Sequence, residues 1–204
     1  MQREVFFQTW SGLHGQARIT GIVRSWLSIS YRCAQVLTAL KISPNFLTFF
    51  GVATAALMAW HPLSPFAIVL LVLSLAADGI DGSVAIYQGR TSNFGATLDS
   101  IADRISEALW LFVAYQVGIS AWLAISLWVI AATQEYARAR AASLGHSVIT
   151  VVTPAERPVR ASAIFILLIA VNLGIDAPYV MGVLFIAQCV SLFLVMRNAY
   201  NSLK

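Results

Sequence analysis

The sequence predicts an all-α membrane protein, with six transmembrane helices preceded by an N-terminal interfacial amphipathic helix. Composition is the first reason. Hydrophobic residues make up 59% of the chain, charged residues only 11%, and the mean hydropathy is +0.77, well outside the range of soluble domains. The second reason is that the apolar residues gather in stretches near the roughly 20 residues that a helix needs to cross a bilayer.

Short joints with helix-breaking residues separate most of these apolar stretches, and only the joint from about 143 to 157 is long. The sequence shows no internal repeat. We therefore expect a six-helix transmembrane domain over residues 44–204 after an N-terminal segment of residues 1–43. The predicted spans are 44–60, 64–88, 93–117, 120–142, 158–175 and 178–200.

The N-terminal segment has the pattern of a helix that lies on a membrane surface. Within residues 18–41, apolar side chains recur at helical spacing and basic residues are spread between them. The apolar positions are Ile22, Trp26, Ile29, Cys33, Val36 and Leu40. Residues 1–10 contain no apolar run followed by a small-residue cleavage site, so we expect the segment to stay attached.

The thirteen basic residues indicate which way the chain crosses the membrane. If the N-terminus is cytoplasmic, the outer joints near 61–65, 118–120 and 174–178 contain no Lys or Arg, and every basic residue falls on the inner side. We therefore expect a plasma-membrane protein with both termini and the active site in the cytoplasm. The basic residues form no stripe interleaved with exposed aromatic residues, so the charge of +4 predicts no nucleic-acid partner.

Four of the five aspartates lie within one short part of the chain. Asp78 and Asp81 are three residues apart, near the inner end of the second predicted span. Asp99 and Asp103 are four residues apart, near the inner start of the third. Each pair shares one helix face, and the short link between the spans is expected to bring the two faces together.

Four carboxylates near a membrane need positive charge close by, because each costs about 2.5 to 3.5 kcal/mol at the centre of a spanning helix. Arg90 and Arg104 are the only basic residues nearby. Divalent cations fit better, since Mg²⁺ and Mn²⁺ prefer oxygen ligands and leave positions for phosphate oxygens. Four carboxylates are enough to hold two such ions. The alternative is a polar network that only packs helices together.

The same residues spell a known signature, DxxDGxxARx8GxxxDxxxD, with seven of its eight fixed positions matched. Over nearly its whole length, the chain therefore resembles the CDP-alcohol phosphatidyltransferase family. The matching residues are Asp78, Asp81, Gly82, Ala85, Gly95, Asp99 and Asp103. The resemblance implies a homodimeric enzyme with two metal ions, which transfers a phosphatidyl group from CDP-diacylglycerol to an alcohol and releases CMP.

The resemblance also implies roles for individual residues. Asp103 would bind metal and act as the general base, because a carboxylate beside the metal can take the proton of an acceptor hydroxyl. Asn45 and Thr48 equally fit a simple helix start, since Ser43 before Pro44 is typical of a cap. The remaining metal ligands would be Asp78, Asp81 and Asp99, and the donor contacts Asn45, Thr48, Gly82 and Ser92.

One position departs from the family pattern. Ile86 stands where the family has arginine, and isoleucine neither donates a hydrogen bond nor carries a charge. Three explanations stay open: the donor diphosphate is held differently, with Arg90 as a substitute one turn later, or the activity is weak, or the donor is unusual. A catalytically inactive scaffold is a further alternative that rests on Ile86 alone.

Basic residues beyond the aspartates point to the acceptor. Segments 136–141 and 156–160 resemble those of actinobacterial phosphatidylinositol-phosphate synthases, the subfamily to which the chain is most similar. The resemblance implies that the phosphate of inositol 1-phosphate is held by Arg138, Arg157 and Arg197. Guanidinium groups clamp phosphomonoesters bidentately. The simpler interpretation, that arginines anchor helix ends, is the one we favour for Arg140 and Arg160.

The predicted reaction is attack by a hydroxyl of inositol 1-phosphate on the phosphorus nearest the lipid, with Mg²⁺, or alternatively Mn²⁺, as the cofactor. Glycerol 3-phosphate is the nearest alternative acceptor, because it is also a phosphomonoester. A cation-coupled transporter is the alternative from another class, and it predicts broken helices with carboxylates at the midplane. Glu107 and Glu135 are expected to pair with neighbours in the bundle, and a structural pair of Glu156 with Arg157 is the alternative to an acceptor role for Arg157.

Overall fold

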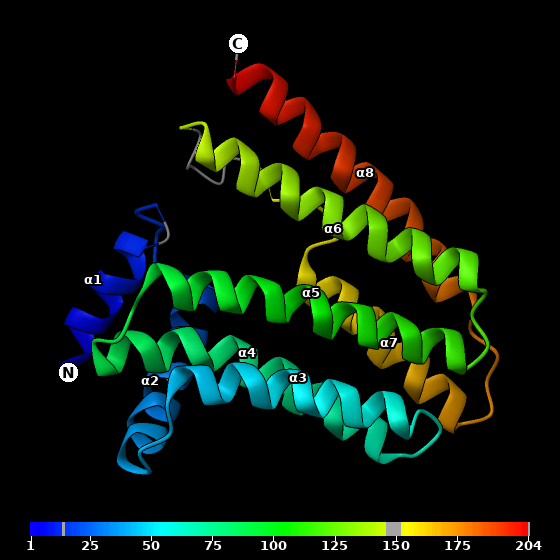
Figure 1. Cartoon of the computed structure of the whole chain (residues 1–204), viewed down its shortest axis with the longest axis horizontal. Coiled ribbons are helices and arrows are strands. Elements are labelled where there is room, and N and C mark those ends of the chain that lie inside the picture. Colours follow the sequence, from blue (N-terminus) through cyan, green and yellow to red (C-terminus); the bar gives the residue numbers. More distant parts are fainter. Residues whose placement is uncertain (14, 146–151, 204) are drawn as a thin grey trace. The chain divides into compact units, whose positions relative to one another are not determined.

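The computed structural model describes residues 1–13, 15–145 and 152–203, and in these ranges the chain is all-α, as predicted (Figure 1). The helices are α1 (Arg3–Leu13), α2 (Gly21–Ala39), α3 (Pro44–Trp60), α4 (Phe66–Gln88), α5 (Asn93–Gln116), α6 (Ala121–Ser143), α7 (Arg157–Asn172) and α8 (Tyr179–Ser202). Helices α3 to α8 follow the six predicted stretches closely, since the turn residues between them were visible in the sequence.

Local capping explains where two of these helices begin and end. The backbone N–H of Phe46 donates to the hydroxyl of Ser43 at 3.2 Å, so the predicted cap of α3 is confirmed. Helix α4 ends at Gln88 and is followed by Gly89, which has a φ of +65°. The N–H of Arg90 then returns to the carbonyl of Ala85 at 2.8 Å, the closure typical of a glycine-terminated helix.

Two helices in the described ranges, α4 and α8, are long and apolar enough to cross a membrane. Helices α2 and α3 together also meet this requirement, as a pair bent by 106°. Helices α5 and α6 carry several charged side chains, and α7 has only 16 residues. The helices thus suit a membrane protein, whereas the count of six spans stays a prediction.

The N-terminal part contains one helix more than the sequence predicted. Helix α2 lies within the predicted 18–41 segment, but α1 precedes it. The hydroxyl of Tyr31 donates to the carbonyl of Met1 at 2.9 Å, and the guanidinium of Arg3 donates to the hydroxyl of Ser28 at 2.5 Å. An 11-residue helix is marginal alone, so tertiary packing on α2 explains why α1 forms.

The chain divides into two compact units, residues 1–54 with 72–106 and residues 55–71 with 107–204. In the first unit, the adjoining parts of α3 and α4 approach closely at a glycine. A Cβ on Gly51 would lie 3.3 Å from the carbonyl oxygen of Ser74, whose hydroxyl donates to the carbonyl of Gly51 at 2.8 Å. The glycine therefore permits close helix packing.

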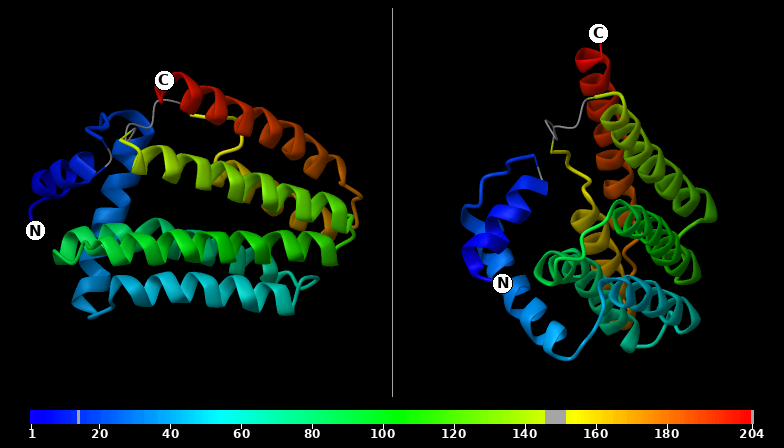
Figure 2. Two further views of the ribbon diagram at one scale, coloured as in Figure 1. Left: turned by 45° about the horizontal axis from the view of Figure 1, so that its top comes forward. Right: turned by 60° about the vertical axis from the view of Figure 1, so that its left-hand side comes forward.

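In the second unit, α6 packs along α8, and α7 also contacts α8 (Figure 2). A buried polar network lies in this packing. The amide of Gln188 donates to the side-chain oxygen of Gln134 at 2.8 Å, and Gln134 in turn donates to the hydroxyl of Thr153 at 3.4 Å. The N–H of Ala155 donates to the hydroxyl of Ser191 at 2.9 Å. These bonds fix the segment that leads into α7 onto α6 and α8.

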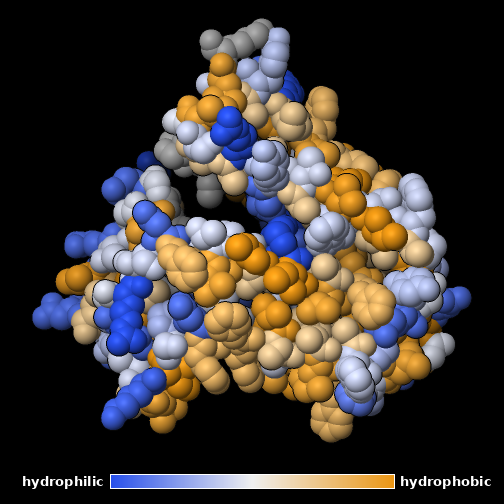
Figure 3. Space-filling view, viewed as in Figure 1, coloured by the Kyte–Doolittle hydropathy of each residue, from blue (hydrophilic) through white to orange (hydrophobic). Residues whose placement is uncertain are grey.

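Large apolar side chains are abundant on the face drawn in Figure 3 and elsewhere on the surface. Trp60 is 80% exposed, Phe66 73% and Trp122 67%. Water-soluble monomers rarely expose large contiguous apolar patches, whereas a surface that meets lipid must be apolar. The exposed side chains therefore agree with the membrane location that composition predicted.

Candidate active site

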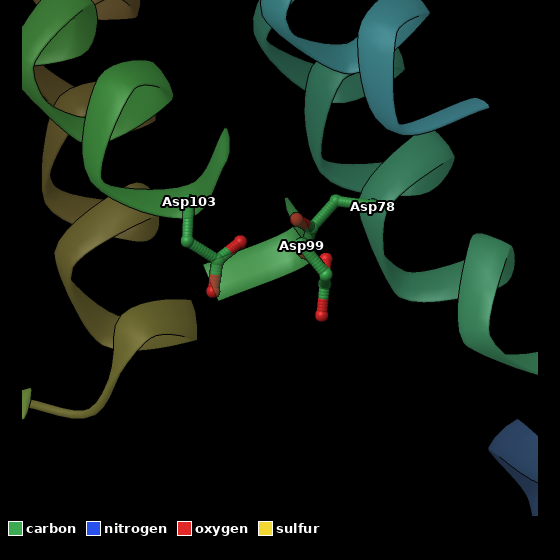
Figure 4. Close-up of side chains that lie close together, drawn as sticks. All are labelled: Asp78, Asp99 and Asp103. Carbon is green, nitrogen blue, oxygen red and sulfur yellow. The ribbon is translucent and has the colours of Figure 1, made fainter. Parts of the chain in front are cut away.

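Three of the four predicted metal ligands converge in the first unit. Asp78 projects from α4, whereas Asp99 and Asp103 project from α5 (Figure 4). One carboxylate oxygen from each lies within 4.8 Å of the other two, and all three side chains are partly buried. The structure thus brings together the two helix faces that the aspartate spacing predicted.

The three carboxylates fit a divalent cation. Mg²⁺ binds oxygen at about 2.0–2.1 Å, so two oxygens on one ion are at most about 4.2 Å apart. The observed limit of 4.8 Å exceeds that value by only about 0.6 Å. The guanidinium of Arg104 lies 3.8 Å from Asp103. A cation bound between the three carboxylates would relieve their mutual repulsion.

Asp81, the fourth predicted ligand, lies outside this group of three. Its side chain is buried, at 4% exposure. The hydroxyl of Thr48 donates to its Oδ2 at 2.5 Å, and the N–H of Gly82 donates to its Oδ1 at 2.5 Å. A carboxylate offers about four lone-pair positions, so these two bonds leave capacity for a metal ion. Its metal role stays a prediction.

A cavity of about 540 Å³ opens in the first unit beside the aspartates. Its volume lies in the range of small-molecule sites, about 300 to 1,000 Å³. Asp78, Asp81 and Asp99 line it. All four residues predicted to contact the donor line it as well, namely Asn45, Thr48, Gly82 and Ser92. The structure therefore gathers residues from three helices and one helix cap around a single space.

Two of these lining residues show what their side chains do locally. A Cβ on Gly82 would meet no atom within 4 Å, so the glycine opens onto free space instead of a tight helix contact. Ser92 caps α5, because its hydroxyl accepts the N–H of Gly95 at 3.0 Å. The capping role of Ser92 and the bond from Thr48 to Asp81 were not foreseen from the sequence.

Ile86, which departs from the family pattern, is buried in an apolar cluster. It is 4% exposed and packs with Phe6 of α1 and Leu27 of α2, both fully buried. Ile86 also lines the cavity, so this position lies between the apolar cluster and the space beside the aspartates. Arg90, the suggested substitute, lines the cavity. The sequence did not reveal the partners of Ile86 because α1 was not expected as a helix.

The three predicted acceptor arginines lie on different helices of the second unit. On α6, Arg138 donates to both carboxylate oxygens of Glu156, at 2.9 and 2.6 Å. On α7, the guanidinium of Arg157 lies 5.2 Å from the ring centroid of Trp110. On α8, Arg197 is exposed. Glu156, whose pairing with Arg157 was the alternative, forms an ion pair with Arg138.

Glu156 holds the segment before α7 in place. The N–H and the hydroxyl of Thr153 donate to it at 2.8 and 2.7 Å. Burial raises the pKa of Glu156, but the hydrogen bonds from Arg138 and Thr153 outweigh burial and lower the pKa to about 2. Glu156 is therefore ionised at neutral pH and orients Arg138.

Arg160 does more than anchor a helix end, so the interpretation favoured from the sequence is wrong here. Its guanidinium is buried, forms an ion pair with the buried Glu107 of α5, and lies 3.5 Å from Glu135 of α6. It also donates to the carbonyl of Ala155 at 2.7 Å. The expectation that Glu107 and Glu135 pair within the bundle is confirmed.

Comparison with known proteins places this arrangement in a family. The family model for CDP-alcohol phosphatidyltransferase matches residues 41–195. The phosphatidylinositol phosphate synthase of Corynebacterium glutamicum is 33% identical over 188 residues, which cover 84% of this chain and 79% of that protein. The archaetidylinositol phosphate synthase of Aeropyrum pernix is 39% identical over 115 residues, which cover 55% of this chain and 59% of that protein.

Solved structures show the same fold. The crystal structure of Mycobacterium tuberculosis phosphatidylinositol phosphate synthase with CDP-DAG bound superposes with a TM-score of 0.68 at 19% identity. The superposition covers 85% of this chain and 94% of that one. The same enzyme in complex with manganese and citrate gives a TM-score of 0.66. From the family model and the extended sequence identity, the chain belongs to the CDP-alcohol phosphatidyltransferase family.

Proposed function

We propose that this enzyme transfers a phosphatidyl group from CDP-diacylglycerol to inositol 1-phosphate, forming phosphatidylinositol phosphate and CMP. The observation that carries the proposal is the group formed by Asp78, Asp99 and Asp103, whose carboxylate oxygens lie within 4.8 Å of one another in the family signature. The names of the relatives from Corynebacterium and Aeropyrum both contain inositol phosphate, which supports this acceptor.

The metal site of this proposal holds two Mg²⁺ ions, with Mn²⁺ as a substitute. Its ligands are Asp78, Asp81, Asp99 and Asp103. The ions, when bound, neutralise charge on the donor diphosphate and on the departing CMP. The complex of the Mycobacterium synthase with manganese supports a divalent metal in this fold. Thr48 has a separate task, since its bond to Asp81 fixes that carboxylate's orientation.

The chemistry is one direct displacement at phosphorus. The acceptor hydroxyl oxygen forms a bond to the phosphorus nearest the lipid, and the bond from that phosphorus to the bridging diphosphate oxygen breaks. The bridging oxygen keeps the electron pair and leaves as part of CMP. Asp103, as the general base, takes the hydroxyl proton.

The donor nucleotide occupies the 540 Å³ cavity in this proposal. Asn45, Thr48, Gly82 and Ser92 contact it. Gly82 is suited to this role because the space beside it is open, so a ligand can approach the backbone. The CDP-DAG bound to the Mycobacterium synthase supports a donor of this class.

The acceptor phosphate is held by Arg138, Arg157 and Arg197. In this proposal the phosphate takes the place of the two longest bonds of Arg138, to Glu135 at 3.4 Å and to Thr153 at 3.5 Å, while the two bonds to Glu156 remain. The aromatic ring of Trp110 supports the guanidinium of Arg157. An acceptor without a phosphate group would need no set of three arginines.

In the membrane, we propose that α3 to α8 form six spans in one catalytic domain, residues 44–204, with both termini and the active site in the cytoplasm. Residues 1–43 form the interfacial segment. On α2, Ile22 is 88% exposed and Val36 60%, so an apolar face is available to lie against lipid. We further propose that the enzyme is a homodimer in the plasma membrane, as the family resemblance implies.

The test is an assay of the purified full chain with Mg²⁺, CDP-diacylglycerol and radiolabelled acceptor, which follows label in lipid and release of CMP. We expect label from inositol 1-phosphate, and none after the metal is removed with EDTA. Incorporation of glycerol 3-phosphate in its place would refute the acceptor. A parallel arm with an archaetidyl donor separates the two lipid classes in the names of the relatives. Failure to form lipid product from any of these pairs would refute the proposed function.

A further inference from the structure

One face of α1 forms part of the cavity wall. Phe6, Trp10 and Leu13 are spaced by four and then three residues, so they share a helix face. Phe6 is fully buried in the cluster with Leu27 and Ile86, and Trp10 packs against that cluster. Trp10 and Leu13 both line the cavity. Docking through Phe6 thus brings the indole of Trp10 to the donor cavity.

Helix α1 is held firmly enough to present this indole. Besides the apolar cluster, Arg3 donates to Ser28 at 2.5 Å and Tyr31 donates to the carbonyl of Met1 at 2.9 Å. The rings of Phe6 and Tyr31 also meet edge to face, with centroids 5.3 Å apart. Such contacts lower the entropy cost of ordering Trp10 when a ligand binds.

A second indole lines the same cavity from α2. Trp26 lies against α4 at Gly79, where an added Cβ would be 2.9 Å from its Cζ2 atom. Gly79 follows Asp78, so the indole lies beside the helix turn that carries a metal-site carboxylate. Trp26 is nevertheless 43% exposed, which leaves much of the ring accessible.

The chemistry of the remaining wall decides which part of the donor these rings meet. Asn45, Thr91, Ser92 and Asn93 bring hydroxyl and amide groups to the cavity. An acyl chain beside them would remove water from polar groups without replacing their hydrogen bonds. A nucleoside offers hydrogen-bonding atoms at its edge and a flat face for an indole. The mixed wall therefore favours the nucleoside end of the donor.

We propose that Trp10 and Trp26 form an aromatic wall on which the pyrimidine base of the CDP-linked donor stacks. This inference rests on the proposed function, because it assigns a part of the same donor to residues of α1 and α2. The inference also gives Ile86 a role. Where the family has an arginine, Ile86 packs against α1, the helix that carries Trp10.

The test measures binding of CMP alone, with Mg²⁺, to the purified full chain by titration calorimetry. Stacking on an aromatic side chain contributes enough that its loss weakens binding at least about fivefold. We expect this loss in Trp10→Leu and in Trp26→Leu, which keep apolar bulk but remove the flat ring. Trp10→Phe and Trp26→Phe should bind within about twofold of the original chain. Trp60→Leu is the matched control, because Trp60 is 80% exposed and lies in the second unit.

Unchanged CMP binding in both leucine variants would overturn the inference. If those variants then also needed more CDP-diacylglycerol for half-maximal rate, the rings would contact the lipid part of the donor instead of its base. The phenylalanine variants separate loss of the ring from misfolding. If the unaltered chain bound CMP through the tryptophans but formed no lipid product, the proposed function would fail while the aromatic wall stood.

Discussion

Ile86 of α4 and Phe6 of α1 pack in one buried apolar cluster, although they lie at distant points of the sequence. The contact joins the position that departs from the family signature to the helix that the sequence did not reveal. It accounts for the missing arginine by packing, since isoleucine fills the contact with Phe6, whereas a guanidinium would either leave that contact for the cavity, which Ile86 also lines, or remain buried among apolar side chains.

Ile86→Arg is therefore expected to release α1 from α4. An arginine that turns into the cavity leaves the contact with Phe6, and one that stays in the cluster buries an unpaired charge at a cost of several kcal/mol, so α1 loses its apolar contact in either case. Hydrogen–deuterium exchange should show faster exchange over residues 3–13 than in the unaltered chain. Ile86→Val is the control and should leave exchange nearly unchanged. Slow exchange in the arginine variant would contradict the docking role of Ile86.

Asp99→Asn and Asp103→Asn are each expected to weaken Mn²⁺ binding by at least about tenfold and to lower CMP release by at least about a hundredfold. Each change removes one charged oxygen ligand from the group with Asp78. Mn²⁺ binding is measured by electron paramagnetic resonance and CMP release by chromatography. Asp176→Asn, at an exposed aspartate outside the group, serves as the control. If both site variants bound Mn²⁺ as tightly as the original chain, these carboxylates would not be the metal ligands.

Gly82→Ala should lower donor affinity while the fold stays intact. The added methyl group meets no protein atom within 4 Å, so it enters the cavity that the donor is proposed to fill. We expect the KM for CDP-diacylglycerol to rise about tenfold, with little change in thermal stability. Gly51→Ala is the opposite case, because its methyl group would lie 3.3 Å from the carbonyl of Ser74. Gly51→Ala should lower the thermal unfolding temperature more than it changes the KM for CDP-diacylglycerol. If Gly82→Ala and the original chain had the same affinity for the donor, the donor would not lie against Gly82.

Glu156 should make stability depend on pH in the acid range. Its pKa of about 2 lies below the ordinary value of 4.5, so its carboxylate stabilises the folded state above pH 4.5. That stabilisation is lost as the pH falls from 4.5 to 2. Glu156→Gln should be less stable at pH 7 and should lose less stability over that interval, as measured by thermal unfolding in detergent. The exposed Glu4→Gln is the control. Parallel stability profiles for Glu156→Gln and the original chain would rule out this role.

Arg160→Met is expected to destabilise the second unit by about 3 to 5 kcal/mol, because it leaves the carboxylate of Glu107 buried without its guanidinium. The double variant Glu107→Gln with Arg160→Met should recover part of that loss, since both charges of this pair are then removed. The free energy of unfolding in denaturant measures both. This account would be contradicted if the double variant lost more free energy of unfolding than Glu107→Gln and Arg160→Met lose together as single changes.

Features that depend on neighbouring residues were predictable from the sequence. Apolar stretches and turn residues located α3 to α8, and Ser43 before Pro44 located the start of α3. The convergence of Asp78 with Asp99 and Asp103 was also predictable, because a short link joins their helices and a spacing of four residues places the last two on one face.

Features that depend on partners far apart in the chain were decided only by tertiary structure. The structure pairs Thr48 with Asp81, Glu156 with Arg138 and Glu107 with Arg160, and it packs Ile86 on a helix that the local pattern did not indicate. Local spacing states which residues share a helix face. It does not state which other helix that face meets, because the choice depends on the summed packing and electrostatic free energy of the whole bundle.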